Sequence, residues 1–204
     1  MEIFKSILPV ITFLLGLIFV PLIEKRKDKY KTKRVHDNFV IDLSDEINNI
    51  AKDNLKIAEA LNNIKNYKLT REPQVGTYKF VPRPMRLYFL ADELDCNFAG
   101  YDKFGRETLK SMFVQVDYLN NLLKIIAETP HETFSIDVLE KYETLYKKYI
   151  FTSLSLRYGM RFLIKKVSKS GISLGDKVIV ENQIKELSLN IDYHYLTTKS
   201  ESTG

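Results

Sequence analysis

The stretch VIDLSDEINNIAKDNLKIAEALNNIKNY, residues 40–67, decides the fold because it carries one continuous, largely apolar stripe. The stripe positions recur at spacings of 4, 3, 4, 3, 4 and 3 residues: Leu43, Ile47, Ile50, Asn54, Ile57, Leu61 and Ile64. This alternation places all of them on one face of an α-helix. The stretch therefore predicts an amphipathic helix that buries this face against another surface.

The one polar stripe position, Asn54, allows two interpretations. A lone Asn in a parallel coiled coil fixes register and oligomer state, which makes Asn54 a candidate self-association residue. In an intramolecular bundle, the stripe is instead widened by Ala51, Ala58 and Ala60. The bundle is favoured, because about three heptads rich in Asn would form only a weak isolated coiled coil.

Upstream, residues 7–23 form a run of seventeen residues without a charge. As a helix this run is roughly 26 Å long, close to the ~30 Å hydrocarbon core of a bilayer. Seven cations follow it: Lys25, Arg26, Lys27, Lys29, Lys31, Lys33 and Arg34. A secretory signal carries its charge before the apolar core, and cytoplasmic flanks are enriched in cations. We therefore expect a single N-terminal transmembrane helix, N-out and C-in, whose cations contact anionic headgroups.

Two small residues within the apolar run, Thr12 and Gly16, lie four positions apart. Small residues at this spacing let two membrane helices approach closely. Thr12 and Gly16 are therefore further candidates for self-association.

The positive charge of the chain is confined to its start. Residues 1–34 contain eight Lys or Arg and three Asp or Glu, which accounts for the whole net charge of +5 and leaves 23 of each sign in the remainder. Because the body is neutral, the basic balance argues against nucleic acid as a partner.

Downstream, the proline-containing residues 67–84 predict a loop, and apolar periodicity predicts further helices at 85–99, 106–128, 135–167 and 176–187. The fold class expected is all-α, with a transmembrane helix followed by a cytoplasmic bundle of four or five helices. The expected organisation is a transmembrane anchor at 1–23, a basic juxtamembrane tract at 24–37, a helical domain at 38–190 and a C-terminal tail at 191–204.

Motifs for catalysis, cofactors and metals are weak. No phosphate-binding glycine motif occurs, and the one Glu-x-x-His pair, Glu128 and His131, is interrupted by Pro130. The acids Asp92, Glu93 and Asp95 are expected to form a solvated helix face. The sequence thus predicts no catalytic residue, no cofactor and no metal site.

Three cations, Arg157, Arg161 and Lys165, recur every four residues on one helix face. They are candidates for binding an anionic partner or the membrane surface; the alternative is pairing with acids elsewhere in the fold or with the helix dipole.

The function expected is that of a noncatalytic membrane-anchored helical module, which self-associates or recruits a partner protein at the cytoplasmic face. One alternative is a membrane-perturbing effector of toxin or phage-defence type, acting through an oligomerised anchor. Another is an enzyme on an unfamiliar helical scaffold.

Overall fold

A computed structural model describes residues 2–73, 76–130, 135–165 and 176–198, with the side chains of residues 1–12, 14 and 18 outside the description. Its elements are α1 (Glu2–Thr70), α2 (Leu90–Asn97), the short 3-10 helix η1 (Phe98–Gly100), α3 (Lys103–Glu128), α4 (Ile136–Leu163), α5 (Asp176–Glu186) and α6 (Tyr193–Thr197). No strand occurs in these ranges. The predicted all-α helical bundle is confirmed.

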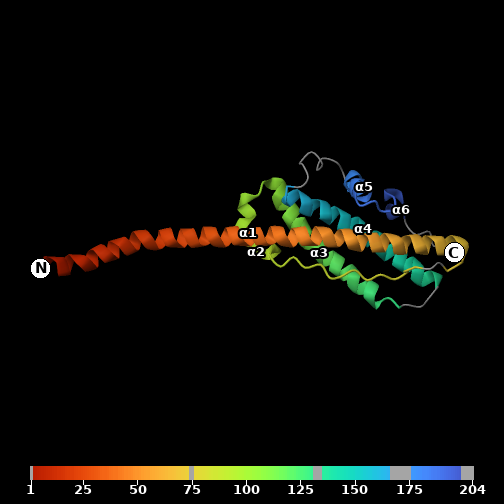
Figure 1. Cartoon of the computed structure of the whole chain (residues 1–204), viewed down its shortest axis with the longest axis horizontal. Coiled ribbons are helices and arrows are strands. Elements are labelled where there is room, and N and C mark those ends of the chain that lie inside the picture. The colour runs from red at the N-terminus through yellow and green to blue at the C-terminus, as the bar shows by residue number, and fades with distance from the viewer. Residues whose placement is uncertain (1, 74–75, 131–134, 166–175, 199–204) are drawn as a thin grey trace.

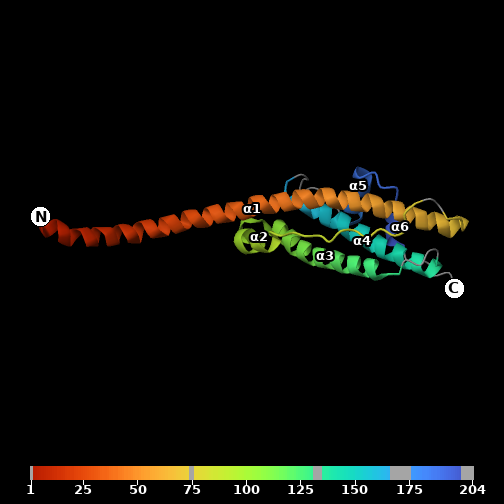
Figure 2. The same cartoon turned by 60° about the horizontal axis from the view of Figure 1, so that its bottom comes forward.

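Helix α1 is a single rod of 69 residues, about 100 Å long at 1.5 Å per residue. Its N-terminal part projects alone, and its C-terminal half forms one wall of the bundle (Figures 1 and 2). From the sequence, this region was expected to contain an anchor, a basic tract and a separate stripe-bearing helix. The structure joins them, because residues 22–70 contain neither Gly nor Pro to interrupt the helix.

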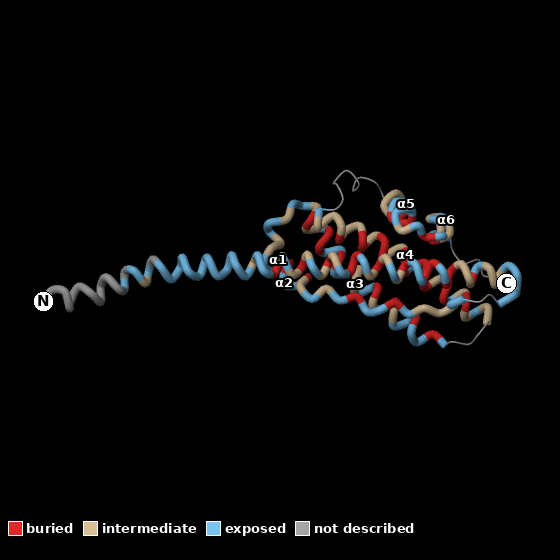
Figure 3. Tube along the Cα trace, in the orientation of Figure 1, coloured by how far each residue is buried: buried red, intermediate tan, exposed pale blue. Residues whose placement is uncertain are grey.

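The stripe of α1 lies inside the bundle, as predicted. All seven stripe positions are buried, and Val35 and Phe39 extend the buried face toward the N-terminus. Figure 3 shows that burial begins where the other helices come alongside α1. The bundle thus starts at about Val35.

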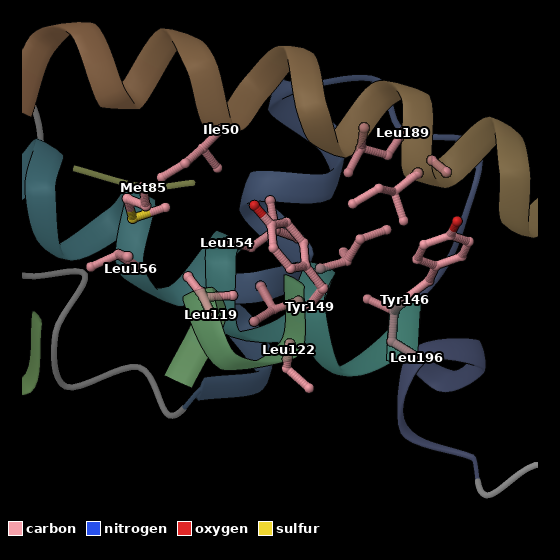
Figure 4. Close-up of a cluster of buried hydrophobic side chains, with 14 of the residues drawn as sticks. Ile50, Met85, Leu119, Leu122, Tyr146, Tyr149, Leu154, Leu156, Leu189 and Leu196 are labelled. Atoms are coloured by element: carbon pink, nitrogen blue, oxygen red, sulfur yellow. The ribbon is translucent and has the colours of Figure 1, made fainter. Parts of the chain in front are cut away.

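Helix α4 is the centre of the bundle, since it packs against α1, α3, α5 and α6. Its large buried side chains include Tyr142, Tyr146 and Tyr149. Figure 4 shows Tyr146 and Tyr149 among apolar groups from several elements. Being covered on several sides, α4 carries buried residues around most of its circumference rather than on one stripe.

Between α1 and α2, residues 76–89 run along the bundle as an extended strap (Figure 2). The loop predicted at 67–84 begins later, because α1 continues to Thr70, and it also ends later. The helix predicted from Met85 starts only at Leu90. The helix starts late because the Met85 backbone forms hydrogen bonds with the Asn120 side chain of α3 instead of with a helix. The Met85 N–H donates to Asn120 at 2.9 Å, and the Met85 carbonyl accepts from it at 3.0 Å.

The strap has no neighbouring strand, so side chains satisfy its backbone groups. The Tyr146 hydroxyl accepts a hydrogen bond from the Phe80 N–H at 2.7 Å and donates one to the Phe80 carbonyl at 3.0 Å. Asp42 of α1 accepts from the Phe89 N–H at 3.0 Å. Burial raises the pKa of the Tyr146 phenol, so the group keeps its proton. These bonds hold the strap in one register over the core.

The remaining helices begin or end at other residues than the sequence predicted. Helix α3 begins at Lys103 rather than at 106, because the Asp102 side chain caps it by accepting from the Gly105 N–H at 2.8 Å. Residues 135–167 were predicted as one helix; α4 ends at Leu163, and 166–167 lie outside the described residues. The predicted C-terminal tail contains α6, whose Leu196 is buried.

Replacing Tyr146 by Phe tests the role of the strap bonds. The variant leaves the Phe80 N–H without its partner, so we expect the free energy of unfolding to fall by about 1 to 3 kcal/mol in urea denaturation. Tyr118→Phe is the matched control, since Tyr118 is exposed on α3. Equal stabilities of the two variants would contradict the assignment.

Candidate functional site

The seven cations predicted to face the membrane are all exposed on residues 24–34 of α1, which we call the stalk. No ion pair joins any of them to a residue within the described ranges. These seven side chains are therefore open to solvent and carry no ion pair within the described residues.

The apolar run before the stalk is described in part. The large side chains that the structure places there are exposed: Phe13, Leu15, Leu17, Phe19, Val20, Leu22 and Ile23. The side chain of Thr12 lies outside the described residues, and Gly16 has nothing within 4 Å of the position that a Cβ would occupy. Where side chains are described, no helix has an apolar stretch long enough to cross a membrane.

Asn54 faces the interior of its own bundle. It is fully buried, and its Oδ1 accepts from the Ser153 hydroxyl of α4 at 2.8 Å. Its amide nitrogen has no hydrogen-bond partner in the described structure. This is the intramolecular arrangement favoured by the sequence, and a second copy can reach Asn54 only if α1 and α4 separate.

The three cations predicted to form one anionic-partner face have different surroundings. Arg157 and Arg161 both pair with Glu186 of α5, and Arg157 also donates to Gln183. Arg157 is buried. Lys165 lies beyond the end of α4, with a left-handed φ of 58°. Two of the three are therefore occupied in holding α5 on α4, as the alternative interpretation predicted.

A polar cluster at the stalk end of the bundle was not predicted from the sequence. Glu93 of α2, expected on a solvated face, is completely buried, whereas Asp92 and Asp95 are not. Its carboxylate binds His36 of α1 at Nδ1 (2.8 Å), the Tyr101 hydroxyl (2.5 Å) and the Asn97 amide (2.6 Å). Three partners offset the cost of burying a carboxylate.

The proton positions in this cluster follow from its chemistry. Burial and the neighbouring Glu93 carboxylate raise the pKa of the Tyr101 phenol, which keeps its proton and donates it to Glu93. The Asn97 amide also reaches the Thr32 carbonyl at 3.2 Å, at the top of the stalk. The cluster therefore fastens α2 to α1 where the stalk leaves the bundle.

A cavity of about 800 Å³ opens beside this cluster. His36, Glu93, Asn97 and Tyr101 line one side, and the end of α4 with Lys165 lines another. No local sequence pattern indicates this site, because His36 and its partner Glu93 are 57 residues apart. Among the described residues, no group of His, Cys, Asp and Glu is arranged to hold a metal ion.

Comparison with known proteins adds no relative: no protein-family model, curated protein or solved structure matches this chain.

The pairing of Glu186 predicts a pH dependence of stability. Burial opposes ionisation of Glu186, but hydrogen bonds and charge from Arg157 and Arg161 outweigh it and lower its pKa below the usual 4.5. A lowered folded-state pKa stabilises the fold above the unfolded-state value, and this contribution is lost as pH falls through the folded-state pKa. The stability difference between wild type and Glu186→Gln should be largest near neutral pH and shrink below about 4.5.

Urea denaturation over a pH series measures this difference. Glu181→Gln is the matched control on the same helix, because its ion pair with Lys177 is exposed and long, at 3.9 Å. A difference for Glu186→Gln that does not change with pH would show that the two arginines do not stabilise the ionised carboxylate.

Proposed function

We propose that this chain is a single-pass membrane protein that holds its helical bundle on a rigid stalk at the cytoplasmic face. There the bundle self-associates or recruits a partner protein, without catalysing a reaction. The observation that carries the proposal is the exposure of the apolar side chains before the stalk, on a helix continuous with the bundle.

The exposed apolar side chains point to all sides of α1. At 100° per residue, Phe13 and Leu17 lie on one side, and Leu15 and Leu22 lie on the opposite side. Each is at least 46% exposed. One neighbouring helix covers only a stripe, whereas lipid covers the whole circumference, and a run that is apolar all round is typical of a membrane span. Lipid is therefore the cover that fits this segment best.

The stalk supplies the orientation. Its seven exposed cations follow the apolar run directly, the arrangement that the positive-inside rule gives to a cytoplasmic flank. Val35, the first buried position among the described side chains, lies twelve positions after Ile23, which sets the bundle about 18 Å beyond the apolar run. The cations occupy this interval, where anionic headgroups attract them.

The outer face of α3 supports a partner-binding role for the bundle. It carries exposed apolar side chains at Phe113 (56%), Val114 (68%), Tyr118 (42%) and Ile125 (43%). Helix α3 packs on α4 through its opposite side, where Leu109, Met112 and Leu119 are buried. An apolar face of this kind on a bundle is where we expect a second copy or a partner protein to bind.

Charged substitutions test the anchor. The double variant Leu15→Arg, Leu17→Arg places two charges near the middle of the apolar run, at a cost of about 2.5 to 3.5 kcal/mol each in a bilayer. We expect wild type to remain in the membrane pellet after alkaline carbonate extraction and the double variant to be released. Leu55→Arg is the control, because Leu55 is 48% exposed on the bundle part of the same helix. Release of wild type itself would refute the anchor.

The single cysteine tests the orientation. Cys96 is exposed on α2, so a membrane-impermeant maleimide reports which side of the membrane the bundle occupies. We expect labelling only after cells are lysed. A Glu2→Cys, Cys96→Ser variant should instead be labelled in intact cells, since it moves the thiol to the opposite end of the apolar run. Labelling of Cys96 in intact cells would contradict the N-out, C-in topology.

A further inference from the structure

The acids that line the cavity beside the Glu93 cluster are already engaged. Glu93 binds three donors, and Asp102 caps α3 through the Gly105 N–H. A cation entering the cavity would have to compete with these partners for the carboxylates. The cavity is therefore poorly suited to a cationic ligand.

The positive and hydrogen-bond-donating groups at the cavity have fewer partners within the chain than the acids do. Within the described residues, no carboxylate pairs with the Lys165 ammonium. The Nδ1 atom of His36 is held by Glu93, and its side chain is 46% exposed, which leaves Nε2 for a ligand. Helix α3, 26 residues long, begins at the cavity wall and adds the positive end of its dipole, partly offset by Asp102. These features favour an anionic group at the polar side.

The rest of the wall is apolar. Val40 of α1 contributes from one side, and Phe162, Leu163 and Ile164 from the end of α4. All four are half-buried, so each presents surface that a ligand can cover. A volume of about 800 Å³ lies within the roughly 300 to 1,000 Å³ of pockets that hold small molecules.

We propose that this cavity binds a small anionic amphiphile, whose head contacts His36 and Lys165 and whose apolar chain lies against Val40 and Phe162–Ile164. Glu93 is a positioning residue in this site, because it holds the imidazole through Nδ1. The site belongs to the bundle alone, so it goes beyond the proposed function and does not depend on how the apolar segment is anchored.

Hexyl phosphate is the probe, because it combines both chemistries and is short enough to enter lipid weakly. The full chain, in nanodiscs of zwitterionic lipid, is titrated by calorimetry with hexyl phosphate, hexanol or inorganic phosphate, and heats from empty nanodiscs are subtracted. We expect hexyl phosphate to bind at least about tenfold more tightly than hexanol or phosphate, since each lacks one half of the contacts. Equal binding of phosphate would mean a simple anion site and would overturn the amphiphile assignment.

Two single variants locate the bound probe. Lys165→Gln and His36→Gln each remove one polar contact and should weaken hexyl phosphate binding by about tenfold. Lys124→Gln, an exposed lysine on the outer face of α3, should leave it unchanged. Unchanged binding in both cavity variants would place the ligand elsewhere and overturn the proposal.

Imidazole NMR of the unmutated chain keeps the proposal testable if a variant fails to fold. Hexyl phosphate should shift the His36 ring resonances and leave those of His194, on α6, in place. No shift of His36 at saturating hexyl phosphate, or no binding to wild type up to millimolar concentrations, would reject the site.

Discussion

The packing of α4 against the apolar stripe of α1 is the interaction on which the rest of the structure depends. At the far end from the stalk, Lys68 of α1 pairs with Glu140 and Glu143 of α4 at 3.1 and 3.2 Å. In the middle, Asn54 and Ser153 meet inside the core. Helices α3, α5 and α6 then use the remaining sides of α4. Without α4 on α1, these elements would share no common surface.

A second constraint comes from α1 itself, which is both the bundle wall and the stalk. A domain on a flexible linker can turn freely, but residues 22–70 of α1 form a continuous helix without Gly or Pro, so the direction of the stalk fixes the orientation of the bundle packed against it. The bundle lies along the helix axis (Figure 1), so on a membrane it would extend away from the surface rather than lie on it. The outer face of α3 would then be presented sideways, toward neighbouring molecules in the same membrane.

The parts of this fold that the sequence predicted are those encoded by local periodicity. The buried stripe of α1 and the helix at 106–128, which α3 contains, follow from spacing alone. The late start of α2 did not, because it depends on Asn120 binding the strap from 35 residues away. The burial of Glu93 likewise depends on His36, 57 residues away. Contacts between residues so far apart in the sequence produce no periodic pattern in it. The start of α2 and the exposure of Glu93 were therefore predicted from neighbouring residues alone, and tertiary contacts changed both.

The Glu93 cluster lies where the stalk joins the bundle. Val35 is the first residue of α1 that is buried among the described side chains, and His36 follows it. The Thr32 carbonyl, three positions before Val35, accepts a hydrogen bond from Asn97. His36 and Asn97, which fasten α2 where the free stalk ends, therefore also line the cavity. Burying the Glu93 carboxylate costs free energy unless its hydrogen-bond donors stay in place. A ligand that contacts His36 therefore also affects the hydrogen bond that holds α2 on α1. Because α1 continues unbroken into the stalk, the joint between bundle and stalk and the polar side of the cavity are one structural unit.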